Sequence, residues 1–125
     1  MLILPWPDSK LLPNAKRRLH WTKYRPAEKA AKQTGWAVAT AGYGRHLERL
    51  RAALGDSGPI PCRITFYPPD RRKRDDDGMI GAFKHARDGI CQALKVDDNR
   101  LRPVYEIGEP EKPGRIEFEL WDREP

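Results

Sequence analysis

The residues that most plainly suit a chemical role are the carboxylates of the stretch RDDDGM, in which Asp75 and Asp77 stand two positions apart. In an extended segment, side chains two apart project to the same side, so these two can share one cation. Mg²⁺ prefers oxygen ligands and commonly binds one or two protein carboxylates together with substrate phosphates. The spacing therefore predicts a divalent-metal site with Mg²⁺ as the expected ion.

Two more acids, Asp97 and Asp98, follow in the sequence, and a lysine stands between the two acidic groups. Lys84 follows Asp77 by two helical turns less about 20°, so both side chains can point the same way. A lysine beside metal-bound carboxylates can orient a nucleophilic water or neutralise charge that grows on a phosphate. Asp97 and Asp98 can fold back toward Asp75 and Asp77 and complete one acidic cluster that binds a cation.

The cations are concentrated in the amino-terminal part of the chain. Residues 1–74 hold 16 Lys and Arg against 5 Asp and Glu, and residues 75–125 hold 8 against 13, which gives net charges of +11 and −5. A basic region of this size favours nucleic acid as a partner, with ordinary surface solubilisation as the alternative. Trp21 and Tyr24 can stack on unpaired bases, although packing is the more common role of an aromatic residue. The cations expected to contact DNA phosphates are Arg71, Arg72, Lys73, Arg74, Lys16, Arg17 and Arg18.

Hydrophobic periodicity predicts the elements that must position these groups. Strands are expected in LILPW, CRITFYP, RPVYEI and RIEFELW, and helices over residues 27–54, with a glycine break near the middle, and 77–94. Residues 7–26, rich in proline and cations, are expected to form a long loop. The first helix should bury one stripe: Trp36, Tyr43, Leu47, Leu50 and Leu54. We expect an α+β fold, a small mixed β-sheet with helices packed on it, in a single domain 1–125.

The cysteines, the apolar first residues and the histidines predict neither export nor a cysteine-based metal site. Cys62 and Cys91 lack paired Cys-x-x-Cys spacing, so neither a zinc site nor a disulfide framework is expected, and a reducing cytoplasm fits best. The opening MLILPW is far shorter than a signal sequence or a membrane span, so no membrane association is expected. His20, His46 and His85 have no partner at ligand spacing and should be surface or packing residues.

Nearly the whole chain resembles the RusA-type crossover-junction endodeoxyribonucleases, the small Holliday junction resolvases of bacteria and their phages. LPWPDSKLLPNAKRRLHW is similar to the opening motif and basic loop of the family, and PDRRKRDDDGM to its arginine-rich acidic motif. KHARDGICQALKVDD resembles the Lys-x3-Asp and Asp-Asp pattern of phage members, and PGRIEFELW resembles their closing strand.

This resemblance implies a role for individual residues. Asp75 and Asp77 match the two acids of the motif, Asp98 matches the metal-binding acid of the Asp-Asp pair, and Lys84 matches the catalytic lysine, while Gly78 replaces the usual asparagine. The implied protein has a RusA-like fold and is a Mg²⁺- or Mn²⁺-dependent homodimer. It would cut branched DNA at four-way junctions in the cytoplasm of a bacterial or phage-infected cell.

Two other functions are compatible with the same residues. In a non-catalytic nucleic-acid-binding module, the first acids would cap a helix, Lys84 would pair with Asp88 on the helix surface, and the final Asp-Asp pair would form a turn. A metal-dependent phosphohydrolase for free nucleotides would use the acids but would not need the long basic amino-terminal half.

Overall fold

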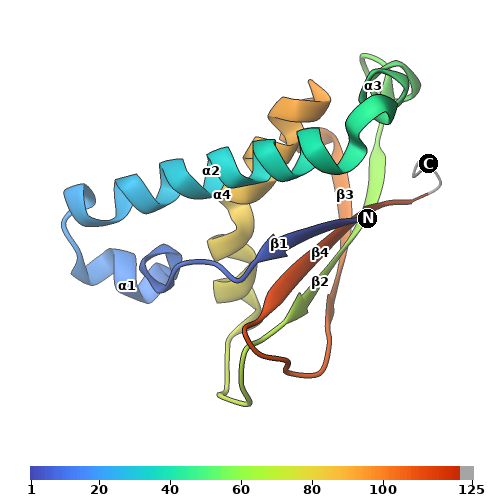
Figure 1. The fold of residues 1–125 in the computed structure, drawn as a ribbon. Coiled ribbons are helices and arrows are strands. Elements are labelled where there is room, and N and C mark those ends of the chain that lie inside the picture. The colour runs from blue at the N-terminus through green and yellow to red at the C-terminus, as the bar shows by residue number, and fades with distance from the viewer. Residues whose placement is uncertain (122–125) are drawn as a thin grey trace.

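The computed structural model describes residues 1–121, which form a four-stranded sheet with helices on one of its faces (Figure 1). The strands are β1 (Leu2–Pro5), β2 (Ile60–Tyr67), β3 (Leu101–Ile107) and β4 (Arg115–Leu120). The helices are α1 (Pro13–Arg18), α2 (Trp21–Tyr43), α3 (Leu47–Leu54) and α4 (Asp76–Leu94). Short 3-10 turns lie at Ser9–Leu11, Gly44–His46 and Asp98–Arg100. The expected α+β class and mixed sheet are confirmed.

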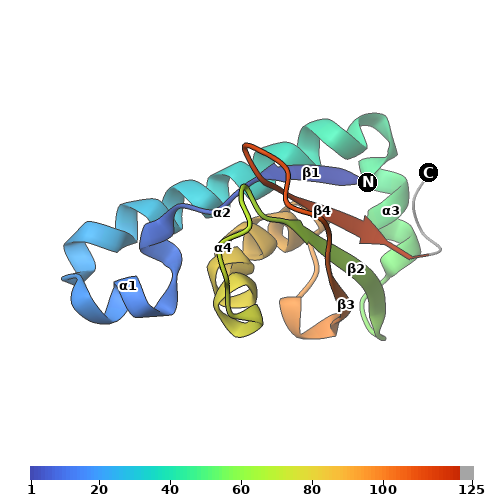
Figure 2. The same ribbon diagram turned by 90° about the horizontal axis from the view of Figure 1, so that it is seen from below.

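The sheet order is β1-β4-β2-β3, and its one parallel pair fixes the direction of α4. β4 is antiparallel to both β1 and β2, whereas β2 and β3 are parallel and pair from Ile60 opposite Leu101 to Phe66 opposite Ile107. Parallel neighbours require a crossover connection, and α4 provides it by running back along the strands (Figure 2). The first turn of α4 therefore lies near the end of β2, and its last turn lies near the start of β3.

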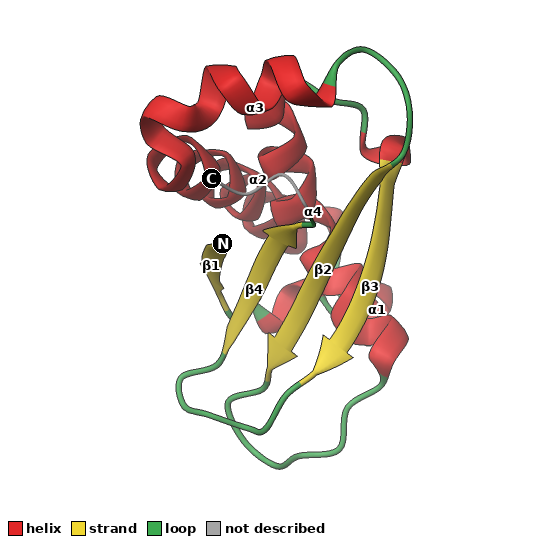
Figure 3. Cartoon of the chain, turned by 90° about the vertical axis from the view of Figure 1, so that its right-hand side faces the viewer, coloured by secondary structure: helices red, strands yellow, loops and turns green. Residues whose placement is uncertain are grey.

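The core lies between the sheet and the helices, because alternate residues of the central strands face the same way. Ile64, Phe66 and Phe118 are each at most 1% exposed, and Phe83 of α4 packs edge-on against Phe66 with ring centroids 6.2 Å apart. The buried alternation predicted for CRITFYP and RIEFELW is confirmed. Figure 3 shows the opposite face of the sheet without a helix over it.

Helices α2 and α4 cross at two glycines. A Cβ atom at Gly35 would lie 2.0 Å from the carbonyl oxygen of Ala86, and one at Gly89 would lie 1.9 Å from the carbonyl oxygen of Lys32. Only glycine allows the two backbones to approach this closely. The predicted break in the first helix is confirmed, but it falls at Gly44, where φ is +51°, and not at Gly35.

Two predictions about the amino-terminal half were wrong. Residues 7–26 are not a long loop but contain α1 and the first turns of α2. No pattern in the sequence indicated α1, because this six-residue helix buries no side chain and so shows no apolar period. Trp36 is 44% exposed, because α2 packs against α4 through small residues, whereas Tyr43, Leu47, Leu50 and Leu54 are buried as expected. No helix within residues 1–121 is both long enough and apolar enough to span a bilayer.

Candidate metal and nucleic-acid site

Three exposed carboxylates stand at the start of α4. Asp75 is the N-cap residue with extended backbone angles, and Asp76 and Asp77 occupy the first turn, where the helix dipole favours negative charge. The Asp75 side chain accepts no capping hydrogen bond. Within residues 1–121, none of the three carboxylates makes a hydrogen bond or an ion pair. They are therefore available to bind a ligand.

These acids line an open depression together with Lys73 and Arg74. Arg71 and Arg72 are exposed beside it, and the Arg71 guanidinium is 4.0 Å from Glu109. Contacts within the chain hold the Arg74 side chain more closely than those of the other three cations. Its guanidinium donates to the Asp70 carboxylate at 2.8 Å and lies 5.6 Å from the centroid of the Trp6 ring. Arg74 thus shapes the loop, and the predicted phosphate contacts in this loop rest on the other three cations.

The second group of predicted DNA-binding cations lies on a helix and not in the expected loop. Arg17 and Arg18 are exposed at the end of α1, whereas Lys16 forms an ion pair with Glu28 of α2. Trp21 is 53% exposed, and the Arg25 guanidinium lies 5.5 Å from its ring centroid. Trp21 is thus exposed and not packed in the core, and its ring is accessible to a ligand.

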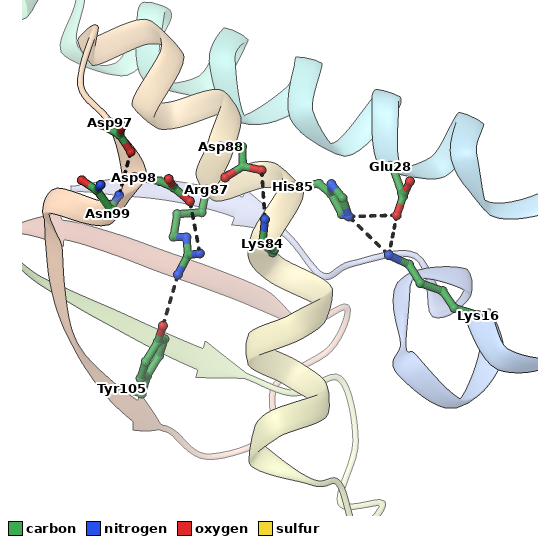
Figure 4. A network of polar contacts seen from close by, with 10 residues as sticks. All are labelled: Lys16, Glu28, Lys84, His85, Arg87, Asp88, Asp97, Asp98, Asn99 and Tyr105. Carbon is green, nitrogen blue, oxygen red and sulfur yellow. Dashed lines mark hydrogen bonds and ion pairs between the residues drawn. The ribbon is translucent and has the colours of Figure 1, made fainter. Parts of the chain in front are cut away.

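Lys84 and Asp88 lie on an exposed face of α4 (Figure 4). The Lys84 ammonium is 3.8 Å from the Asp88 carboxylate, one turn further along the helix, and the lysine side chain is 55% exposed. Lys84 follows Asp77 by two turns, a rise of about 10 Å along the helix. The predicted pairing of Lys84 with Asp88 is therefore present.

Asp98 lies in the turn after α4, where the chain folds back alongside the helix. It begins the turn before β3, and its carboxylate is 3.7 Å from the guanidinium of Arg87, which also reaches the Tyr105 hydroxyl at 3.5 Å (Figure 4). Arg87, the partner of Asp98, follows Asp75 by twelve residues, a rise of about 18 Å along α4. Asp98 therefore folds back along the helix as far as Arg87, but the expected pocket of three acids does not form within residues 1–121.

A further polar cluster joins α1, α2 and α4 (Figure 4). His85 Nε2 lies 3.0 Å from the Glu28 carboxylate and 3.3 Å from the Lys16 ammonium. Burial lowers the pKa of His85, and Lys16 lowers it further, while Glu28 acts in the opposite direction. His85, expected to be a surface or packing residue, is partly buried and has two polar partners. Its partners are distant in sequence, and no local motif marks them.

The carboxylates of one chain fit a hard divalent ion only in part. The donor set at Asp75 and Asp77 is all oxygen and unpaired, as Mg²⁺ prefers, and Mg²⁺ often uses no more than two protein carboxylates. Within residues 1–121, however, no three His, Cys, Asp or Glu side chains gather in a geometry that holds a metal ion. In that part of the chain, Asp75 and Asp77 thus have no third protein ligand beside them.

Comparisons with known proteins leave the function to be argued from these residues. No family model matches the chain. A protein of Xylella fastidiosa (strain Temecula1 / ATCC 700964), described as an uncharacterized protein, is 43% identical over 104 residues, which cover 80% of this chain and 61% of that protein. The chain thus spans about three fifths of the length of this relative.

Proposed function

We propose that the chain is a divalent-metal-dependent endodeoxyribonuclease that cuts four-way DNA junctions as a twofold homodimer. The observation that carries the proposal is that, within residues 1–121, the carboxylates of Asp75, Asp76 and Asp77 are unpaired and lie beside Arg72 and Lys73, whose side chains make no ion pair there. Surface acids beside cations ordinarily form ion pairs. Acids and cations that remain separate can bind a metal ion and the phosphates of a nucleic acid, respectively.

Individual residues take distinct roles in this proposal. Asp75 and Asp77 would hold the ion through carboxylate oxygens, and the bound ion would supply an activated water and stabilise the leaving 3′ oxygen. Arg71, Arg72 and Lys73 contact backbone phosphates beside the acids, so they position the DNA without reading its sequence. Arg17 and Arg18 extend this phosphate contact to α1, and the exposed Lys84 ammonium adds positive charge along α4.

The third acid of the proposed site comes from the second copy of the chain. Asp98 of the same chain stands beside Arg87, about 18 Å along α4 from Asp75. In a twofold dimer with antiparallel α4 helices, each Asp98 would be directed toward the partner's first helical turn. Two equivalent composite sites then match the two equivalent strands of a junction, which are related by the same symmetry.

One observation favours the non-catalytic binding module as the second candidate. Asp98 has an ion-pair partner in Arg87, and Lys84 has one in Asp88. If these pairs are purely structural, the protein binds nucleic acid without cutting it. Such a module is indifferent to a metal chelator.

Cleavage of synthetic DNA separates the two candidates. A labelled four-way junction and a linear duplex of the same sequence are incubated with the protein in Mg²⁺, in Mn²⁺ or in EDTA. We expect symmetric cuts in the junction with either metal, little cleavage of the duplex, and none in EDTA. Junction binding without cleavage under all three conditions would establish the binding module and overturn the nuclease.

Substitution of the acids tests which residues hold the ion. Removing a group that only supports a metal ligand typically costs 10–100-fold, so we expect Asp75→Asn and Asp77→Asn to lower the cleavage rate by about 100-fold or more. Junction binding in EDTA should be retained. Asp56→Asn, which changes an exposed acid in the turn before β2, is the matched control and should cut at the wild-type rate.

A further inference from the structure

Among residues 1–121, strand β3 pairs with β2 alone and so forms an open edge of the sheet (Figure 3). The Gly108 N–H donates to the Phe66 carbonyl at 2.8 Å, which shows that Gly108 directs its backbone groups toward β2. Because residues two apart direct these groups to the same side, Arg102, Val104 and Glu106 also face β2. The backbone groups of the odd-numbered residues of β3 therefore point outward.

Pro103 agrees with this assignment. A proline is tolerated on an edge strand where its missing N–H would have faced outward. In the same strand, Tyr105 and Ile107 direct N–H groups outward, and the side chains of Val104 and Ile107 are 42% and 52% exposed. A seven-residue edge with exposed apolar side chains invites pairing with another strand.

We propose that β3 pairs antiparallel with β3 of a second copy of this chain, with the twofold axis at Val104. The strand reads Leu101-Arg-Pro-Val-Tyr-Glu-Ile107 and is self-complementary about its centre. In this register Arg102 stands opposite the partner's Glu106, and Leu101 stands opposite the partner's Ile107. Opposite charges and apolar residues placed directly across a sheet each stabilise the pairing.

Neighbouring registers lose these matches. A shift by two residues in one direction places Val104 opposite Arg102, and in the other direction opposite Glu106, so that the two charges no longer face each other. A shift by one residue would require every side chain of the strand to change to the other face of the sheet. The burial of Leu101 against the helices fixes these faces and so excludes that shift. Charge complementarity thus selects both the partner and the register.

The backbone groups fit the same register. The N–H groups of Tyr105 and Ile107 would donate to the carbonyl oxygens of Pro103 and Leu101 in the second copy, and the symmetry repeats both bonds. The Arg102 guanidinium already donates to the Leu101 oxygen at 2.9 Å and to the Asn99 oxygen at 2.7 Å, which leaves a second lone pair on the Leu101 oxygen. The Leu101 N–H needs no new partner, because it donates to the Asp98 carbonyl.

This pairing also bears on the proposed nuclease site, and that part of the inference rests on the proposed function. Antiparallel pairing sets the start of one β3 beside the end of the other. Asp98 precedes the start of β3, and Arg87 contacts both Asp98 and Tyr105, so α4 follows the β3 edge. In the paired dimer, Asp98 of one copy therefore lies on the side of the interface where α4 of the second copy begins.

Cysteine cross-linking tests the register directly. Side chains opposite each other in a non-hydrogen-bonded pair have Cβ atoms about 4.5–5.5 Å apart, so Val104→Cys should form a disulfide between two copies under mild oxidation. Ile107→Cys is the matched control at an equally exposed position of the same strand. Its two copies would lie six residues apart, about 20 Å, and should stay unlinked. Equal cross-linking of both variants, or a wild-type chain that sediments as a monomer, would overturn the proposal.

A charge exchange tests the same interface without oxidation. Arg102→Glu and Glu106→Arg each place like charges opposite each other twice, so each variant alone should dimerise about tenfold more weakly. An equimolar mixture of the two restores both opposite-charge pairs and should dimerise at the wild-type strength. Failure of the mixture to recover would contradict the register. These measurements need neither metal nor DNA, so a dimer that forms but cuts nothing would refute only the nuclease.

Discussion

Asp75 illustrates how a single residue is left available for ligand binding. An aspartate at the N-cap ordinarily accepts a hydrogen bond from the first turn, which contributes about 1 kcal/mol to helix stability. Asp75 makes no such bond, while Asp76 and Asp77 supply the charge that the helix dipole favours. The capping explanation that the sequence left open for these acids therefore does not hold for Asp75.

His85 provides a test at the level of one titrating group. Its pKa in the folded chain lies below the ordinary value near 6.5, mainly because burial disfavours the charged ring. Below about pH 6.5 the unfolded chain binds more protons at this residue, so His85 should lower the free energy of unfolding as the pH falls from 7 to 5. We expect His85→Gln to lose less thermal stability than wild type over that range.

His46→Gln serves as the control, because His46 lies in the turn between α2 and α3, away from this cluster. The melting temperatures of the three proteins at pH 7 and pH 5 give the comparison. An identical loss of stability in His85→Gln and wild type would show that His85 does not couple folding to pH.

At the scale of elements, the crossing of α2 and α4 explains why part of the fold escaped sequence analysis. Glycine commonly interrupts a helix, yet Gly35 lies within α2, where the backbone of Ala86 in α4 occupies the space that a side chain would need. Trp36, which matched the apolar period, is displaced to the rim by the same close approach. Hydrophobic periodicity predicts helix faces that bury large side chains, but it does not predict a close contact between two helix backbones.

The crossing predicts unequal effects of two glycine substitutions in α4. Gly89→Ala would place a Cβ 1.9 Å from a backbone oxygen of α2, which cannot move alone, and should cost about 2 kcal/mol or more in unfolding free energy. Gly81→Ala meets only the Pro13 side chain at 3.7 Å and should be neutral or stabilising by up to about 1 kcal/mol. Urea unfolding measures both. A Gly89→Ala variant as stable as Gly81→Ala would contradict the close packing.

For the molecule as a whole, the strands, the helix over 77–94 and the exposed acidic motif could be predicted because each is a local pattern. The contact of His85 with Lys16 could not, since 69 residues separate them. The position of Asp98 could not be predicted either, because its contact with Arg87 depends on how the chain turns after α4. We propose that this third acid joins Asp75 and Asp77 through a second molecule.

The measurement that tests this most directly is cleavage by a mixture of two inactive variants. Asp75→Asn and Asp98→Asn chains are unfolded together in equal amounts, refolded, and assayed on a four-way junction with Mg²⁺. Each variant alone should be inactive, whereas half of the mixed dimers should be heterodimers with one intact composite site, so about a quarter of the wild-type sites should be recovered. A mixture as inactive as its components, beside a wild-type protein that cuts, would contradict a site shared between two copies.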